Sequence, residues 1–287
     1  MMIELLQLLI YGIVLGSILT LGAIGVSMLF GILKFANFAH GDLMTLGAYI
    51  TLLFVTAGGM NIWVALPLAL LATGLVSVLI DQALYRRLRR TAPVIMLISS
   101  FGVALILRSL IQLIWGPDIH VFKTGIQMPH RVGDLIIKPD HVWIVLGALL
   151  LVIGLHLFLT RTRMGKAMRA MSDNMDLALI SGIPAEKVIM WTWLMGGALA
   201  AGAGIFLGLD TRLHPVMGWG VLLPVFAAAI LGGIGSPYGA IAGGMVIGIA
   251  MEVSTLFLEP TYKPAVAFAI MVVMLIVRPQ GLFGGRA

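Results

Sequence analysis

Long apolar runs recur along almost the whole chain, and they leave few choices of fold. Several of them reach about 18 residues or more, enough for an α-helix to cross a hydrocarbon core about 30 Å thick. Of the 287 residues, 60% are apolar and 10% are charged, whereas about a quarter of a soluble domain is charged. A globule of this composition would lack the polar side chains to cover its surface. The sequence therefore predicts an all-α polytopic membrane bundle, with residues 1–287 forming a single transmembrane domain.

The polar breaks divide the chain into nine apolar segments, which predicts about eight to ten membrane segments, some of them broken or re-entrant. Val221–Leu231 is too short to span alone, so it either extends back through Trp219 or forms a half-helix. The segments are roughly Leu5–Phe30, Phe38–Thr56, Ile62–Leu84, Val94–Trp115, Val142–Leu159, Val188–Leu209, Val221–Leu231, Gly239–Leu258 and Pro264–Val277.

Glycine is dense, with 35 residues that often recur at helical spacing. In lipid no hydrophobic force drives helices together, and small residues allow their backbones to approach closely. The glycines therefore predict tightly packed helices, and some of them could instead lie on surfaces that slide during a transport cycle.

Basic residues gather in two links, after the third and the fifth segment. Lys and Arg are enriched in cytoplasmic loops, so both links are expected on the cytoplasmic face, and the net charge of +6 does not indicate nucleic-acid binding. An odd number of segments then places the N-terminus and the link Gly116–His141 outside and the C-terminus inside. The clustered residues are Arg86, Arg87, Arg89 and Arg90, and then Arg161, Arg163, Lys166 and Arg169.

The longest polar run is Thr160–Lys187, in the second basic link. Ser172 or Asp173 can cap the start of a short helix, and Asp176 places an anion in its first turn. Gly182 then ends it. A helix of about two to three turns does not persist alone in water. Either its own bundle or the lipid headgroups hold it, or it seats in a groove of a cytoplasmic partner.

Polar residues interrupt the second apolar segment. Asn37 could cap its helix, and Asp42 could complement the positive end of that helix. The alternative places His40 or Asp42 on a substrate route or its inner gate, because buried polar groups in membranes tend to be functional. His40 and Asp42 are two residues apart, so they do not share a helix face and a proton relay between them is not expected.

Glycines, Ser236 and Pro237 break the apolar sequence within Ala229–Gly244. The ends of half-helices at such a break can face the carboxylate or ammonium group of a substrate. The alternative is a plain turn at the membrane surface.

Isolated charges inside the apolar segments are few. Asp81 lies near the end of its segment and can reach the Arg86 cluster. Arg108 and Glu252 each lie about two turns from an outer end, where a long side chain can extend to the surface. The rival interpretation is an ion pair between Arg108 and Glu252.

The chain lacks the motifs of an enzyme. It has no G-x-x-x-x-G-K-[ST] phosphate loop, no His or Cys cluster with metal-ligand spacing and no Ser/His/Asp arrangement, so no catalytic residue, metal site or cofactor is expected. An ion-coupled secondary transporter or a channel is the alternative to a chain driven by partners. It would be expected to carry a titratable cluster near mid-membrane, of which the sequence offers almost nothing.

Five stretches, taken in order, resemble the membrane permeases of branched-chain amino acid ABC importers. They are NFAHGDLMTLGAY, LYRRLRR, TRMGKAMRA with SGI, AAILGGIGSPYGAIAGG and RPQGLFG. The resemblance covers nearly the whole chain and is to the shorter of the two permeases that usually pair in these systems. Urea-type or amide-type ABC permeases are a close relative and remain an alternative.

The resemblance implies a multi-pass subunit of the bacterial inner membrane. A periplasmic binding protein would deliver leucine, isoleucine or valine. Two homologous permeases in membrane lipid would form the path, and two cytoplasmic ATPase subunits would bind the ATP. The run Thr160–Lys187 would match the element that docks on an ATPase.

The resemblance and the polar positions together give three sets of candidate residues. The coupling candidates are Gly165, Arg169, Asp173, Asp176 and Gly182. The candidates for the substrate path or gate are Asn37, His40, Asp42, Ser236 and Tyr238. The candidates for contact with the binding protein are Asp118, Asp134 and Asp140.

Overall fold

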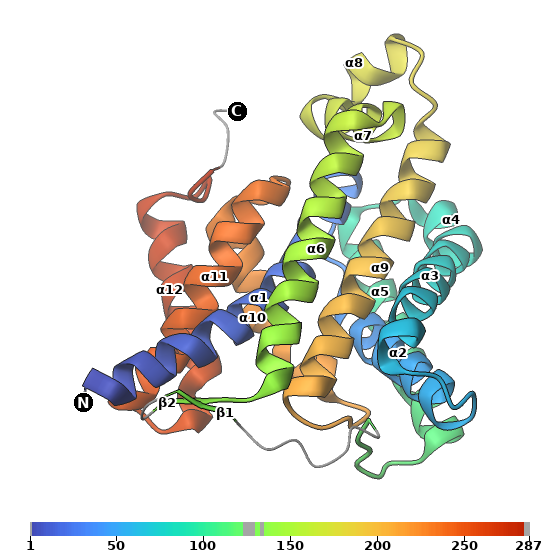
Figure 1. Ribbon diagram of the computed structural model, residues 1–287. Coiled ribbons are helices and arrows are strands. Elements are labelled where there is room, and N and C mark those ends of the chain that lie inside the picture. Colours follow the sequence, from blue (N-terminus) through green and yellow to red (C-terminus); the bar gives the residue numbers. More distant parts are fainter. Residues whose placement is uncertain (1, 123–129, 133–134, 284–287) are drawn as a thin grey trace.

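The computed structural model describes residues 2–122, 130–132 and 135–283 as a bundle of helices (Figure 1). Within these residues, seven helical stretches are long and apolar enough to cross a membrane, and the 16-residue α10 is shorter. The elements are α1 (Met2–Leu33), α2 (Ala39–Thr56), α3 (Ile62–Ile80), a π-helical turn (Asp81–Tyr85), α4 (Arg86–Leu88), α5 (Pro93–Trp115), β1 (His130–Val132), β2 (Leu135–Ile137), α6 (Pro139–Arg161), α7 (Arg163–Asp173), α8 (Met175–Ile180), α9 (Ala185–Asp210), α10 (Met217–Gly232), α11 (Pro237–Val253), two 3-10 turns (Ser254–Leu256 and Pro260–Tyr262) and α12 (Lys263–Val277).

The helices confirm the predicted all-α membrane bundle, because each of the nine predicted apolar segments falls on one long helix. The segment that was too short to span extends back through Trp219, since α10 begins at Met217. The only strands among the described residues are β1 and β2, which pair antiparallel in the link between α5 and α6.

The bundle has two distinct ends, which we call the basic end and the hairpin end. The basic end carries α7, α8 and the described C-terminus, and the hairpin end carries the N-terminus and the β1–β2 hairpin (Figure 1). At the hairpin end, the Gln7 side chain of α1 donates to the carbonyl of Ile136 at 2.8 Å. At the basic end, Glu186 at the start of α9 pairs with Arg86 and Arg89. Both basic links therefore lie at one end, as the charge pattern predicts.

Glycines bring helix backbones into direct contact at two crossings. A Cβ added at Gly248 of α11 would lie 2.3 Å from Gly16 Cα of α1, and a Cβ at Gly204 of α9 would lie 1.8 Å from the Met44 carbonyl oxygen of α2. Real carbon atoms never approach so closely, so neither position has room for a side chain. These crossings confirm the predicted role of glycine in tight helix packing.

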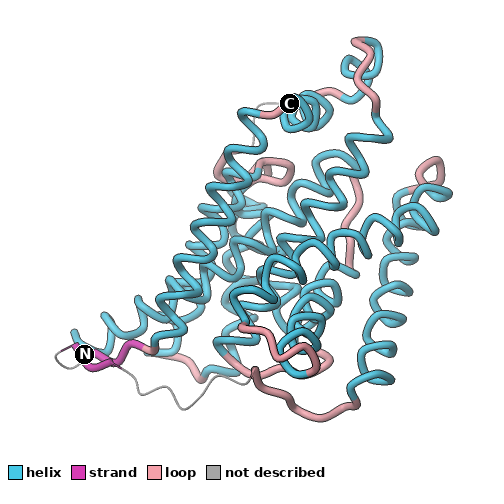
Figure 2. The backbone as a smooth tube through the Cα atoms, turned by 45° about the vertical axis from the view of Figure 1, so that its right-hand side comes forward, coloured by secondary structure: helices cyan, strands magenta, loops and turns pink. Residues whose placement is uncertain are grey.

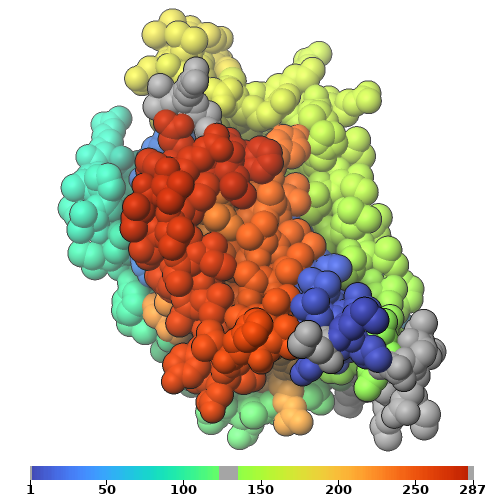
Figure 3. Space-filling view, turned by 90° about the vertical axis from the view of Figure 1, so that its left-hand side faces the viewer, coloured from blue at the N-terminus to red at the C-terminus, as the bar shows by residue number. Residues whose placement is uncertain are grey.

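The outer helices differ in what they cover. Figure 3 shows α11 and α12 over one face, with the start of α1 emerging beside them. On the other side, α5 lies at the edge of the bundle and packs chiefly on α2 (Figure 2). Large apolar side chains of α5 remain exposed there, among them Phe101 and Ile106.

Candidate functional site

A bidentate ion pair joins α2 to α5 within the membrane-spanning part of the bundle. Arg108 donates from Nε to Asp42 Oδ1 and from Nη2 to Asp42 Oδ2, each at 3.1 Å. Asp42 is fully buried, whereas 18% of the Arg108 side chain is exposed. The Arg108 guanidinium also lies 4.9 Å from the ring centroid of Trp219 on α10. Three helices thus meet at one charged group.

Both sequence interpretations of Arg108 are wrong. Its side chain pairs with Asp42 inside the bundle instead of extending to the membrane surface, and Glu252 pairs with Lys263 at 2.6 Å. The physical reason is the position of Asp42, whose carboxylate would be costly to bury alone. By contrast, the expected link between Asp81 and the basic cluster is confirmed, with Arg89 as its partner.

Aromatic rings surround the start of α2 beside this ion pair. The Phe38 ring centroid lies 5.5 Å from that of Phe226 and 6.4 Å from that of Trp219, both on α10. It lies 6.5 Å from the ring centroid of Phe101 on α5. The Phe38 N–H donates to Ser100 Oγ at 3.0 Å, which fixes the chain just before α2 against α5. The ion pair therefore borders an aromatic wall that reaches the exposed edge of α5.

Asn37 and His40 lie close to this site but have other contacts. Asn37 lies one residue before the N-cap of α2, which is Phe38 and not Asn37 as predicted, and its Oδ1 accepts the N–H of Ala39, the first residue of α2, at 3.1 Å. His40 is fully buried, and its ring packs against Gly25 of α1, where an added Cβ would lie 2.7 Å from His40 Cε1. In the described part of the chain, no side-chain hydrogen bond or ion pair joins His40 to Asp42, in keeping with their spacing. A role of Asn37 or His40 in a substrate path stays a prediction.

Ser236 and Tyr238 lie at the basic end, away from the Asp42–Arg108 pair. The break between α10 and α11 is a helix-to-helix turn, in which Ser236 Oγ accepts the N–H of Gly239 at 3.1 Å and caps α11. The Tyr238 hydroxyl lies 2.9 Å from His156 Nδ1 on α6. The structure thus favours the plain turn and does not bring these residues together with Asp42. Their assignment to the path also stays a prediction.

The loop after α6 folds into two helices instead of the single short helix predicted. Thr162 Oγ1 accepts the N–H of Gly165 at 2.9 Å and starts α7 ten residues before the expected cap. Neither Ser172 nor Asp173 begins a helix, because both lie at the end of α7. Asn174 instead caps α8, its Oδ1 accepting the N–H of Leu177 at 2.9 Å. The helix that begins after Thr162 therefore continues through Ser172 and Asp173, which are its last two residues.

The coupling candidates take defined places on this loop. Gly165 is buried where α7 crosses α6, and an added Cβ would lie 2.2 Å from the Phe158 carbonyl oxygen. Asp176 is in the first turn of α8, as predicted, and Gly182 ends the loop with a φ of +80°. Arg169, Asp173, Asp176 and Gly182 are all exposed.

The α8 helix projects beyond the rest of the bundle at the basic end (Figures 1 and 3). Its apolar side chains point to solvent, with Ile180 86% exposed and Leu177 65% exposed. Such exposed apolar side chains are typical of a surface that contacts a partner or lipid, and the docking role of the loop stays a prediction.

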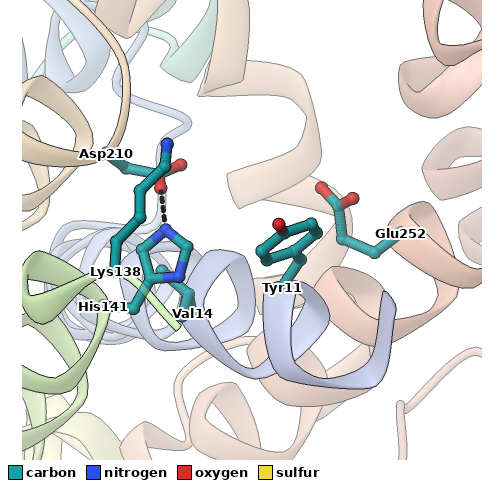
Figure 4. A pocket seen from close by; sticks show the side chains of 6 residues that line it. All are labelled: Tyr11, Val14, Lys138, His141, Asp210 and Glu252. Carbon is teal, nitrogen blue, oxygen red and sulfur yellow. Dashed lines mark ion pairs between the residues drawn. The ribbon is translucent and has the colours of Figure 1, made fainter. Parts of the chain in front are cut away.

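A separate polar hollow of about 270 Å³ lies at the hairpin end (Figure 4). His141 Nε2 lies 3.2 Å from Asp210 Oδ1, and the Tyr11 ring meets the His141 ring edge-on at 5.5 Å between centroids. Sequence reasoning missed this hollow because its residues come from four elements far apart in the chain. Its lining is Tyr11, Val14, Lys138, His141, Asp210 and Glu252.

Of the three residues predicted to contact the binding protein, only Asp140 is adjacent in sequence to a residue that lines this hollow. Asp140 is in the first turn of α6, next to His141. Asp118 is exposed in the link after α5, and the following His120 exchanges two backbone hydrogen bonds of 2.9 Å with Leu213. Asp134 lies outside the residues that the structure describes.

Comparisons with known proteins agree with this architecture. The family model described as "Branched-chain amino acid transport system / permease component" matches residues 8–275. The chain is 32% identical to the high-affinity branched-chain amino acid transport system permease protein LivH of Escherichia coli, over 97% of this chain and 95% of that protein. It is also 32% identical to BraD of Pseudomonas aeruginosa, with the same coverage.

A solved structure shares the fold at lower sequence similarity. PsaBC from Streptococcus pneumoniae in complex with Fab aligns with a TM-score of 0.54 and 14% identity, over 98% of this chain and 94% of that chain. At that identity the likeness shows the fold alone. The family match over most of the chain, together with the long relatives at 32% identity, shows that this protein belongs to the branched-chain amino acid transport permeases.

Proposed function

We propose that the chain is the membrane permease subunit of an ABC importer that moves leucine, isoleucine or valine inward across the bacterial cytoplasmic membrane. Separate ATPase subunits drive it, and a periplasmic binding protein supplies the substrate. The observation that carries this proposal is the match of residues 8–275 to the permease family. The basic end faces the cytoplasm in this arrangement, which puts the N-terminus in the periplasm and the C-terminus inside, as Lys and Arg enrichment favours.

The Asp42–Arg108 pair supports a location for the substrate path. Of the Arg108 side chain, 18% is left uncovered by the described part of the chain. A charged group at that depth is costly against lipid, so such groups usually face a protein partner or a water-filled route. A second, homologous permease seated against α5 would cover it, and the path would run between the two subunits. Trp219 and Phe101 would then give the path an apolar wall suited to branched aliphatic side chains.

Removal of the left-handed turn after α8 should uncouple the permease from its ATPases. Gly182→Pro cannot adopt the φ of +80° and loses the N–H that donates to Leu179 at 3.0 Å. ATP-driven uptake in membrane vesicles is expected to be lost, while the chain still inserts. Gly182→Asn, which tolerates this conformation, is the matched control and should retain uptake.

Asp176→Lys, with a cation in the first turn of α8, should also lose uptake. Normal uptake by both Gly182→Pro and Asp176→Lys would contradict the docking role.

Charge reversal in the outer link tests contact with the binding protein. Asp118→Lys combined with Asp140→Lys should raise the concentration of binding protein required for half-maximal uptake, because rim charges mainly affect association. Uptake at saturating binding protein is expected to change much less. Titration of uptake against binding-protein concentration measures both quantities. An unchanged titration curve would rule out the two carboxylates as contacts.

Purification and transport together test the function as a whole. The tagged permease should co-purify with a second permease and with ATPase subunits that contain a phosphate loop. The complex in vesicles with its binding protein should take up leucine, isoleucine or valine only when ATP is present. Uptake by the lone chain in vesicles without ATP would favour an ion-coupled transporter or a channel. Uptake of urea but of no branched-chain amino acid would correct the substrate class.

A further inference from the structure

The loop after α6, which carries α7 and α8 and which we call the cytoplasmic loop, connects with the π-helical turn Asp81–Tyr85 through charged side chains. Glu186 follows the loop directly, in the first turn of α9. Its carboxylate pairs with Arg86 Nε at 3.2 Å and with Arg89 Nη1 at 3.0 Å. Arg89 in turn binds the buried carboxylate of Asp81, the first residue of the π-helical turn. Ion pairs therefore connect the start of α9 with both ends of this turn.

A second connection runs through the body of α9. Trp193, two turns below Glu186 on the same helix, is fully buried and stacks on Tyr85 with 5.0 Å between ring centroids and an interplanar angle of 9°. The Tyr85 hydroxyl donates to Asn37 Oδ1 at 3.4 Å. Asn37 Oδ1 also accepts a hydrogen bond from the N–H of Ala39, the first residue of α2. Tyr85 thus lies between the helix that leaves the loop and the helix that carries Asp42.

The π-helical turn is suited to having two arrangements. Its closing hydrogen bond joins the Arg86 N–H to the Asp81 carbonyl, and it interrupts an otherwise α-helical stretch. Such single turns hold one extra residue and occur mostly at functional sites. Beside it, the indole N–H of the fully buried Trp193 interacts with the buried carboxylate of Asp81, so the first residue of the turn also contacts α9.

We propose that Asp81, Tyr85 and Arg89 are positioning residues that transmit movement of the cytoplasmic loop to the start of α2. In this view the π-helical turn shifts when the ATPases move α8 and the start of α9. Tyr85 passes that shift through Asn37 to the first turn of α2, which carries Asp42 and so controls its pairing with Arg108. The inference rests on the proposed function and extends it, since it names the internal route from ATP hydrolysis to the substrate path.

The test measures how much ATP the importer uses for each substrate molecule. The full complex with its binding protein is reconstituted in vesicles, and leucine uptake and ATP hydrolysis are measured in the same preparation. Deletion of the exposed Ala83 removes the extra residue of the turn while keeping Asp81 and Tyr85. Tyr85→Phe keeps the ring stack and removes only the hydroxyl. In both variants ATP hydrolysis should stay within about twofold of wild type, while leucine uptake falls about five- to tenfold.

Matched controls separate transmission from folding. Ala83→Ser keeps the length of the turn, and Tyr262→Phe removes a hydroxyl from an exposed tyrosine at the hairpin end. Both should keep the wild-type ratio of ATP to leucine. If the Ala83 deletion does not accumulate, Tyr85→Phe decides alone. Wild-type import with an unchanged ratio in Tyr85→Phe, or a proportional fall of both activities, would overturn the inference. A wild-type complex that imports no branched-chain amino acid would instead overturn the proposed function, and the inference with it.

Discussion

Arg108→Ala is expected to destabilise the protein by about 3–5 kcal/mol, because it leaves a buried carboxylate without its partner. Asp42 is fully buried, and Arg108 satisfies both of its oxygens at 3.1 Å. Such a loss is a large part of the stability of a typical protein. The amount of chain in the membrane fraction and its thermal denaturation in detergent should both fall. Asp42→Asn should cost less, because the guanidinium that remains is partly exposed and stacks on Trp219.

The double variant Asp42→Asn with Arg108→Gln separates the structural role of the pair from its role in transport. Two neutral amides remove both charges together. The double variant should therefore lose much less stability than the sum of the losses in the two single variants. If the pair borders the substrate path, leucine uptake should stay low although the complex assembles. Full uptake by the double variant would mean that the pair only stabilises the fold. Normal accumulation of Arg108→Ala would contradict the burial argument itself.

Gly204→Val is expected to abolish accumulation of the folded chain. The added Cβ would lie 1.8 Å from the Met44 carbonyl oxygen and 2.4 Å from the Met44 carbonyl carbon. Both atoms belong to the backbone of α2, so no side-chain rotation relieves the overlap and the helices must separate. Overpacking of a core costs about 1–3 kcal/mol when side chains can adjust, and this crossing should cost more. The same shift would displace α2, and with it Asp42, from α5.

Two other glycines provide the matched comparison. Nothing lies within 4 Å of a Cβ added at Gly102 of α5 or at Gly154 of α6. Both are exposed positions within long helices, so Gly102→Val and Gly154→Val should accumulate as the wild type does. Detergent extraction followed by size-exclusion chromatography gives the fraction of folded chain for all three variants. Equal yields would mean that α2 and α9 do not cross at Gly204.

Several local features could be predicted because they depend on neighbouring residues alone. The hydrogen bond of Asn37 to the first N–H of α2 and the left-handed stop at Gly182 follow from side-chain reach and backbone preference within a few residues, although the N-cap itself is Phe38. The pairing of Asp81 with the basic cluster is similarly local, since Arg89 follows it by two turns of the same helix. In the loop after α6 the same reasoning failed. Thr162 and Asn174 cap the two helices there, and Ser172 and Asp173 are residue types that favour the same position, so residue type alone does not identify the caps.

The charged sites depend on contacts that no local pattern reveals. Arg108 and Asp42 are separated by 66 residues, and the hollow beside His141 draws on helices from both halves of the chain. Sequence spacing does not show which two charges share a depth in the bundle. The segment boundaries place Asp42 near the inner start of its segment and Arg108 about two turns from an outer end, so they do not indicate the pair.

The sequence by itself determined the membrane bundle, its division into nine apolar segments and the gathering of both basic links at one end. These follow from the cost of exposing backbone and charge to lipid, which acts on each segment separately. Only the tertiary structure decided that α2 meets α5 through Asp42 and Arg108, that the loop after α6 forms two helices and that Tyr85 links α9 to α2. Those contacts depend on how helices pack against one another, and packing in lipid is set by the fit of small and polar side chains across distant segments.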